Sequence, residues 1–179
     1  IKWTNYENKE KVVLPNPMSI DKSIVRTSII PSLLNVYNYN KKRKVKDILI
    51  YEIAKTYDKQ YNEESKIAGL LAGNYMSNGW NFTKKIDFYI VKGIVEDLLD
   101  YMGLKNRYSF ITSTIDDLHP GISAKILLDR KEIGIIGRVH PKLLKDEKKT
   151  TEIQVDKQLI FSQIHIEQKQ YIINASGNQ

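Results

Sequence analysis

The sequence predicts an α+β fold, with a mostly antiparallel sheet of about six strands flanked by helices. Apolar runs of strand length are separated by turn residues, and two longer segments repeat apolar residues at helical spacing. The helical segments fall irregularly between the strands, whereas a doubly wound parallel sheet needs regular alternation. The clearest strands are Ile122–Leu128 and Ile133–Val139, which form a hairpin around a turn at Asp129-Arg130-Lys131.

Three further strands are predicted in the first half of the chain. Val12–Leu14 is a short one, stopped by Pro15. Val45–Tyr57 contains the continuous apolar run Ile48–Tyr51, which predicts a strand covered on both faces. Ile67–Gly73, built from small and aliphatic residues, predicts a second buried strand.

The first helix is predicted to follow Arg26-Thr27. Ser28 is a suitable N-cap, which places Pro31 in the first turn, where its missing N–H costs little. Apolar residues then recur at helical spacing, and the basic run of residues 41–44 suits the negative C-terminal end of a helix. We therefore expect the helix to end within this run.

The second helix is predicted to begin at Asp87, which can cap it. Gly103 stands where a helix commonly ends. Gly93 inside the helix costs about 1 kcal/mol relative to alanine, which predicts a close neighbour that needs the space. The expected inner face comprises Phe88, Val91, Val95, Leu98 and Met102.

The remaining segments complete the expected domain. They are a strand at Arg107–Ser113, a short helix at Lys142–Lys145 and a strand at Thr151–Val155. We expect a polar N-terminal segment at 1–11, a core domain at 12–160 and a C-terminal tail or linker at 161–179. Because the first residue is isoleucine, the chain is expected to be an internal piece of a longer polypeptide, with processing as the alternative.

Composition excludes several classes of protein. The sequence contains no cysteine, which rules out a disulfide framework and fits a cytoplasmic protein. No apolar run is long enough to cross a membrane. The net charge of +7 comes mostly from scattered lysines, with one cluster that is a candidate RNA contact, Lys41, Lys42, Arg43 and Lys44. A solvated surface is the alternative explanation for this cluster.

A series of short motifs points to a family. Residues 16–34 join Asn16-Pro17 to Arg26-Thr27-Ser28 and to an apolar helix start at Ile29-Ile30-Pro31. Further motifs follow in order: Ile50–Lys55, Ala68–Asn74, Trp80 with Asp87-Phe88-Tyr89 and Lys92-Gly93, Leu118–Gly121, and Ile135–Pro141. Over roughly residues 12–156 the chain resembles the catalytic-like core domain of the bacterial phenylalanyl-tRNA synthetase β subunit, although Arg138 stands where that family more often has glutamate.

The resemblance implies a class II aminoacyl-tRNA synthetase catalytic-like fold. It also implies a partner, the catalytic α subunit, with two αβ pairs forming a tetramer that attaches phenylalanine to tRNA(Phe) using ATP and Mg²⁺. In this family the β-subunit core is a non-catalytic scaffold. The chain itself is therefore expected to be inactive alone and to hold no cofactor.

The residues themselves support this expectation. Class II enzymes grip ATP with an arginine in an Arg-x-Glu strand motif and another arginine after a glycine-rich strand. Here Arg130-Lys131-Glu132 falls at a hairpin tip, and Gly134–Arg138 lacks the Glu-Arg pair. His119 and His140 each precede proline and His165 stands alone, so no metal site is expected. An independent ligase is accordingly disfavoured.

The predicted contact with the partner rests on the first helix. Glu52 lies inside an apolar strand, and if it is buried it needs a salt bridge, a backbone hydrogen bond or a contact with the partner subunit. Tyr37 and Tyr39 extend the apolar stripe of the helix, which favours an interface. The interface candidates are Arg26, Ile30, Leu33, Leu34, Tyr37 and Glu52. The alternative function is a free-standing basic RNA-binding module that uses Lys41–Lys44 with Tyr37 and Tyr39.

Overall fold

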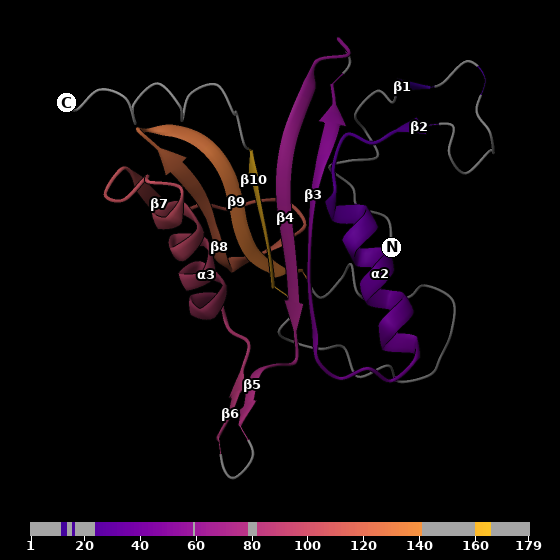
Figure 1. The fold of residues 1–179 in the computed structure, drawn as a ribbon, viewed down its shortest axis with the longest axis vertical. Coiled ribbons are helices and arrows are strands. Elements are labelled where there is room, and N and C mark those ends of the chain that lie inside the picture. Colours follow the sequence, from indigo (N-terminus) through magenta and orange to yellow (C-terminus); the bar gives the residue numbers. More distant parts are fainter. Residues whose placement is uncertain are drawn as a thin grey trace.

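The computed structural model describes residues 12–13, 16, 24–58, 60–78, 82–140 and 160–165 (Figure 1). Within these ranges the fold is α+β with antiparallel sheets and two helices, as the sequence predicts. The predicted segments Lys142–Lys145 and Thr151–Val155 lie outside the described residues, as do residues 1–11 and 166–179.

A six-stranded antiparallel sheet forms the centre of the molecule. Its strand order is β3-β4-β10-β9-β8-β7. These strands are β3 (Ile48–Tyr57), β4 (Glu63–Ala72), β7 (Tyr108–Thr112), β8 (Leu118–Leu128), β9 (Lys131–Val139) and β10 (Ile160–His165). Two small two-stranded sheets accompany it, β1 (Val12–Val13) with β2 (Ile24–Val25) and β5 (Asn74–Asn78) with β6 (Phe82–Lys85).

The first helix, α2 (Ile30–Lys42), begins one residue later than expected. Its N-cap is Ile29, whose side chain cannot cap, whereas the Ser28 hydroxyl accepts a hydrogen bond from the Ile30 N–H at 3.2 Å. Pro31 occupies the first turn, as predicted. Ser28 therefore stabilises the helix start from just outside it.

The second helix, α3 (Phe88–Tyr101), begins as predicted, because the Asp87 carboxylate accepts a hydrogen bond from the Ile90 N–H at 2.8 Å. Gly103 follows the helix with φ +78°, a left-handed conformation that glycine adopts without strain. The explanation expected for Gly93 is wrong. A Cβ on Gly93 would meet nothing within 4 Å, so no neighbour needs the space.

The two helices pack on opposite faces of the sheet. In β4 the side chains alternate: Ala68, Leu70 and Ala72 belong to the core beneath α2, whereas Ile67 and Leu71 belong to the core beneath α3. Helix α3 lies over β9 and β10, while α2 lies over β3 and β4 (Figure 1). The sheet is thus buried on both faces in its middle.

Strand β3 departs from its prediction, because it is not covered on both faces. Leu49, Tyr51 and Ile53 are 45%, 74% and 63% exposed. Strand β3 is at the edge of the sheet, and α3 covers strands further in. The apolar run correctly indicated a strand, but the outer face of that strand lies beyond the reach of α3.

The boundary expected at residue 160 is also wrong. Strand β10 lies inside the segment expected to be a tail or linker, yet it pairs with β4 on one side and β9 on the other. Ser162 and Gln163 interrupt its apolar pattern, and its partners are distant in sequence. A local reading of the chain therefore could not recognise it, and the sheet extends at least to His165.

No helix within the described ranges is long and apolar enough to cross a membrane.

Candidate functional site

Helix α2 is the element on which the predicted interface rests, and its expected contact residues face inward. Ile30, Leu33, Leu34 and Tyr37 are 1%, 4%, 2% and 4% exposed and belong to the core between α2 and the sheet. These four side chains hold the helix to its own sheet. Because they are buried there, they are not available for direct contact with a partner subunit, contrary to the prediction.

The outer face of α2 presents a different set of side chains. Asn35 is exposed, and Val36 and Tyr39 are 44% and 57% exposed. We call these three residues the outer α2 face. The sequence carried a signal for it, because a helix whose residues 30, 33, 34 and 37 face one core turns residues 35, 36 and 39 away from that core.

Arg26 and Glu52 are brought together, as the need to pair Glu52 predicted. The Arg26 guanidinium lies 2.5 Å from the Glu52 carboxylate, and its Nε donates a hydrogen bond to the Lys55 carbonyl at 3.2 Å. The Tyr57 N–H donates to the Arg26 carbonyl at 3.1 Å. These contacts fasten the segment before α2 to β3. Because both side chains are partly exposed, the ion pair itself contributes at most about 1 kcal/mol.

A second charged group adjoins this pair on β3 and β4. Glu63 accepts hydrogen bonds from Lys55 and, at 2.9 Å, from the Tyr57 hydroxyl. The Lys55 hydrogen bond, followed by that of Tyr57, holds the pKa of Glu63 below its ordinary value. The hydrogen bond from the Tyr57 hydroxyl to Glu63 in turn raises the pKa of Tyr57. The group is exposed and balanced in charge, which is typical of a solvated strand end.

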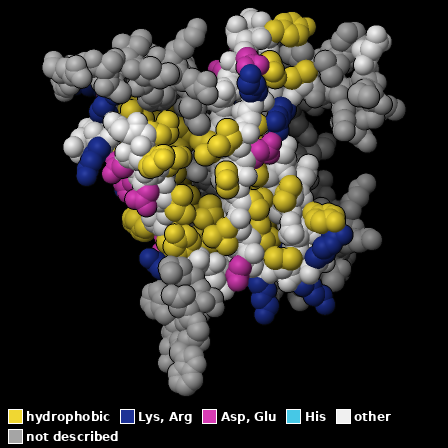
Figure 2. All heavy atoms as spheres, viewed as in Figure 1, with side chains coloured by type: hydrophobic (Ala, Val, Ile, Leu, Met, Phe, Trp, Pro, Cys, Tyr) yellow, Lys and Arg dark blue, Asp and Glu magenta, His cyan; other side chains and the backbone are white. Residues whose placement is uncertain are grey.

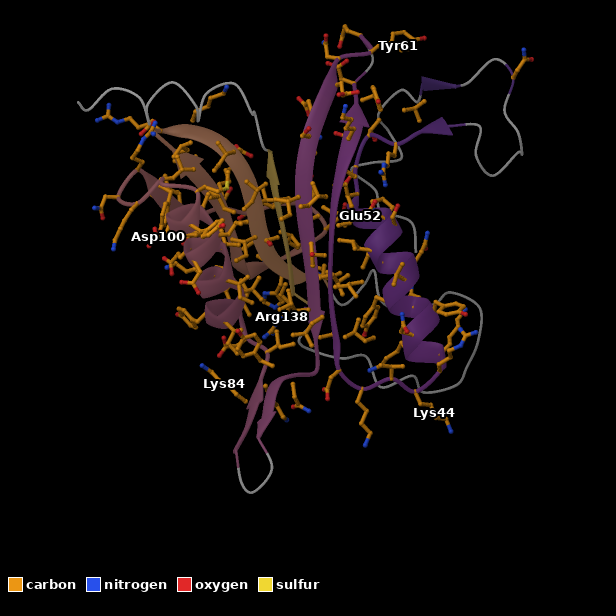
Figure 3. All side chains as sticks on the ribbon, in the orientation of Figure 1. Lys44, Glu52, Tyr61, Lys84, Asp100 and Arg138 are labelled. Atoms are coloured by element: carbon orange, nitrogen blue, oxygen red, sulfur yellow. The ribbon has the colours of Figure 1, made fainter. Side chains whose placement is uncertain are left out.

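The basic cluster lies at the C-terminal end of α2. Lys42, Arg43 and Lys44 are exposed, and Lys41 is partly buried. The Arg43 guanidinium stacks 3.5 Å from the centre of the Tyr39 ring. Figure 3 shows Lys44 at this end of the helix and Glu52 near its other end, so the two predicted sites are separated. Whether the cluster contacts RNA stays a prediction.

The residues weighed for ATP binding have structural explanations. Asp129 and Arg130 have φ of 48° and 70°, a tight hairpin turn, and Glu132 is paired with Lys125 at 2.7 Å. Gly137 lies where a Cβ would come within 2.9 Å of the Ile122 carbonyl oxygen, so this glycine allows close approach of β8. The Nε of Arg138 is buried without a hydrogen-bond partner among the described residues.

The histidines form a stacked pair. The His119 and His140 rings have centroids 6.5 Å apart, and His119 Nδ1 accepts a hydrogen bond from the Gly121 N–H at 3.2 Å. In the described ranges no three His, Cys, Asp or Glu side chains come together in a way that could hold a metal ion. His119 lies within β8 and His140 directly follows β9, so the pair stands where these two strands adjoin and not in a turn.

Tyr108 gives a testable pH dependence. Burial raises its pKa to about 12, and the hydrogen bond from its hydroxyl to Asp100 at 2.9 Å adds to the shift. An unfolded tyrosine ionises near pH 10. The stability that Tyr108 contributes is therefore complete below about pH 10 and is lost as the pH rises toward about 12. Urea unfolding at about pH 9 and about pH 11 should show a larger loss for the natural chain than for Tyr108→Phe.

The matched control is Tyr101→Phe, since Tyr101 is 92% exposed. This variant should lose as much stability as the natural chain over the same pH interval. Equal losses in the natural chain and in Tyr108→Phe would contradict the assignment.

Comparison with known proteins supplies a family for this architecture. The family model described as the phenylalanyl tRNA synthetase beta chain CLM domain matches residues 1–152. The phenylalanine–tRNA ligase beta subunit of Geobacillus kaustophilus is 38% identical over 146 residues, which is 78% of this chain and 18% of that protein. The corresponding protein of Bacillus subtilis is 38% identical over 158 residues, covering 84% of this chain and 20% of that protein. The chain thus spans about a fifth of the length of these relatives.

Proposed function

Because this chain belongs to the β-subunit family of phenylalanine–tRNA ligases, we propose that it is a scaffold domain that pairs with the catalytic α subunit. The whole enzyme attaches phenylalanine to tRNA(Phe) in the cytoplasm, using ATP and Mg²⁺ held by the α subunit, and two αβ pairs form a tetramer. The family match over residues 1–152 carries this proposal. The central antiparallel sheet with one helix on each face supports the finer proposal of a class II catalytic-like fold.

The arrangement of arginines supports a non-catalytic role. Activation of an amino acid by ATP needs cations aimed at the phosphates. Arg26 is paired with Glu52, Arg107 with Asp129, and Arg43 is stacked on Tyr39. Arg130 lies in the hairpin turn between β8 and β9. These arginines stabilise local structure instead of converging on one site.

The outer α2 face is the proposed contact with the α subunit. Val36 and Tyr39 are apolar or aromatic and about half exposed, and aromatic residues are enriched in protein interfaces. Arg26 and Glu52 lie beside the start of the same helix, where they can contribute polar contacts at the rim. The buried residues Leu33 and Leu34 keep the helix rigid against the sheet while its outer side docks.

Co-purification with the cognate catalytic α subunit tests this proposal. The natural chain should form a complex, and the double variant Val36→Asp, Tyr39→Asp should reduce the amount recovered at least about tenfold, because interface residues at hot spots each contribute 2 kcal/mol or more. Circular dichroism should show an unchanged fold, since both positions are exposed.

Tyr101→Asp is the matched control, because Tyr101 is a fully exposed tyrosine on α3, over the other face of the sheet. It should leave the complex intact. Failure of the natural chain to bind the α subunit would overturn the scaffold role, whereas full recovery of the double variant would overturn the docking surface alone.

The runner-up function is a free-standing basic RNA-binding module. The observation in its favour is the exposed cluster of Lys42, Arg43 and Lys44 beside the aromatic ring of Tyr39. Micromolar binding of tRNA by the chain alone, lost steeply as salt rises, would favour this function over the scaffold.

A further inference from the structure

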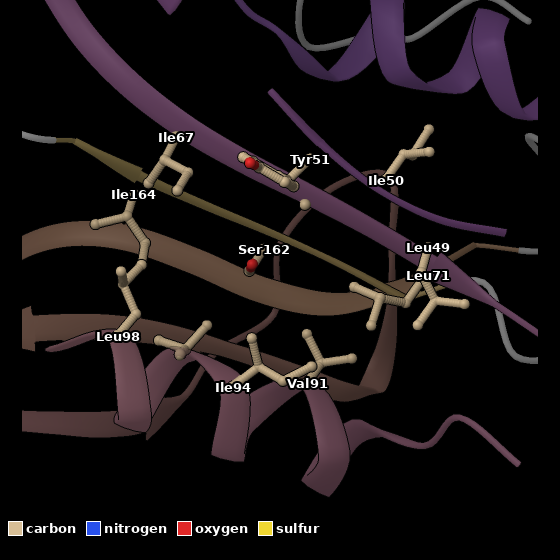
Figure 4. Close-up of a pocket in the computed structure, with 12 residues that line it drawn as sticks. Leu49, Ile50, Tyr51, Ile67, Leu71, Val91, Ile94, Leu98, Ser162 and Ile164 are labelled. Carbon is tan, nitrogen blue, oxygen red and sulfur yellow. The ribbon is translucent and has the colours of Figure 1, made fainter. Parts of the chain in front are cut away.

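A hollow of about 310 Å³ opens on the face of the sheet that carries α3. It lies between α3 and the edge strand β3, with β4 and β10 as its floor (Figure 4). Figure 2 shows apolar side chains gathered over this part of the surface. Its walls include Leu49 and Tyr51 from β3 and Ile94 and Leu98 from α3. Helix α2 packs on the opposite face of the sheet, so the hollow is separate from the proposed docking surface.

Two small residues side by side create the hollow. Gly69 on β4 is paired across the sheet with Ser162 on β10. The next pair on one side is Ile67 with Ile164, and Leu71 lies on the other side, so larger side chains surround the low point. Because α3 lies over β9 and β10 and not over β3, the space above Gly69 stays open.

The Ser162 hydroxyl is the polar feature of this floor. Ser162 is 8% exposed, and its side chain makes no hydrogen bond to any residue in the described ranges. Figure 4 shows its oxygen in the open space between the strand wall and the helix wall. The hydroxyl borders the hollow and is accessible from it, so a ligand in the hollow can form a hydrogen bond with it.

We propose that this hollow binds a neutral, mostly apolar small molecule whose single hydrogen-bonding group pairs with the Ser162 hydroxyl. The volume falls within the range of small-molecule sites, which are concave, apolar and fitted with few polar groups. Among the described residues, no lysine, arginine, aspartate, glutamate or histidine lines it. Phosphates and free amino acids are thereby excluded, because their charges would be buried without partners.

Binding of N-phenyl-1-naphthylamine tests the site. This probe is neutral and apolar, carries one N–H, and becomes fluorescent in apolar surroundings. We expect saturable binding to the 179-residue chain. Gly69→Val should weaken binding at least about tenfold, because a Cβ at Gly69 has ordinary contacts at 3.8 Å and the added methyl groups fill the hollow. Ser162→Ala should weaken it about threefold by removing one hydrogen bond.

Ile94→Gln provides a second way to alter the site without touching the sheet, since Ile94 is 36% exposed on α3. It should weaken binding several-fold. Gly93→Ala is the matched control and should leave affinity unchanged, because nothing lies within 4 Å of that position.

Unchanged affinity in both Gly69→Val and Ile94→Gln would overturn the proposal, since the probe would then bind elsewhere. Light scattering measures whether the chain is a monomer or a dimer, and so tests whether a second copy of the chain occupies the hollow. If the natural chain dimerises and Ile94→Gln makes it monomeric, the hollow is a surface for a second copy, and the small-molecule site is wrong.

Discussion

Leu34→Ala is expected to lower the free energy of unfolding of this chain by about 3 kcal/mol in the absence of any partner. Leu34 is 2% exposed and packs in the core with Ile48 and Leu70 beneath α2. Truncation removes apolar contacts and leaves a cavity that a well-packed helix and sheet fill only in part. Urea unfolding followed by circular dichroism measures the change.

The matched control is Val36→Ala on the outer side of the same helix. Val36 is 44% exposed, so the change in unfolding free energy should stay within about 0.5 kcal/mol. If Leu34→Ala left stability intact but abolished binding to the α subunit, Leu34 would belong to the interface after all, and the inward orientation of α2 would be wrong.

Gly137→Ala is expected to destabilise the fold by about 2–3 kcal/mol. A Cβ at this position would lie 2.7 Å from Leu118 Cδ1, 2.9 Å from the Ile122 carbonyl oxygen and 3.1 Å from Ser123 Cα. Two of these three atoms are backbone in β8, which cannot move aside without breaking its pairing with β9. Thermal unfolding should show a correspondingly lower midpoint.

Gly93→Ala serves as the opposite control. Its Cβ has free space and the position is inside α3, so alanine should stabilise the helix by about 0.5–1 kcal/mol. The two substitutions add the same methyl group, and the structure predicts opposite signs. A stable Gly137→Ala variant would mean that β8 and β9 do not approach as closely as described.

The features that sequence analysis predicted correctly are those fixed by neighbouring residues. Asp87 and Gly103 define α3 through a cap and a left-handed residue within a few positions of the helix. The hairpin at Asp129-Arg130 follows from alternation on both sides of a short turn. In each case the energetic cause is local, so a single stretch of sequence contains it.

The features that were missed depend on contacts between distant segments. The outer side of β3 is apolar, and nothing in the run Ile48–Tyr51 says that α3 stops short of it. Ser162 interrupts the apolar pattern of β10, because its side chain faces the hollow and not the packed core. Periodicity identifies a strand only when every side chain on one face packs in the same apolar core. In β10, Ser162 faces the hollow, so the apolar pattern is broken.

The candidate site shows the same division. Glu52 is paired with Arg26, as the sequence predicted, but both side chains are partly exposed, so the pairing does not come from the burial of a charge. The sequence identified the apolar stripe of α2, but it could not show whether the stripe faces the chain's own sheet or a partner subunit. An apolar helix face packs equally well against either. In the structure, this stripe packs against the chain's own sheet through Ile30, Leu33, Leu34 and Tyr37.

The position of β10 has a consequence for how the protein is made. Strands β3 and β4 form one hairpin, and β7, β8 and β9 form a second unit, and the two are joined in the sheet through β10. During synthesis both units emerge from the ribosome before their bridge does, each with one unpaired edge at β4 or β9. The last of the described strands to be translated thus joins the two units, and nascent chains that stall before it expose two edges competent to pair with the wrong neighbour.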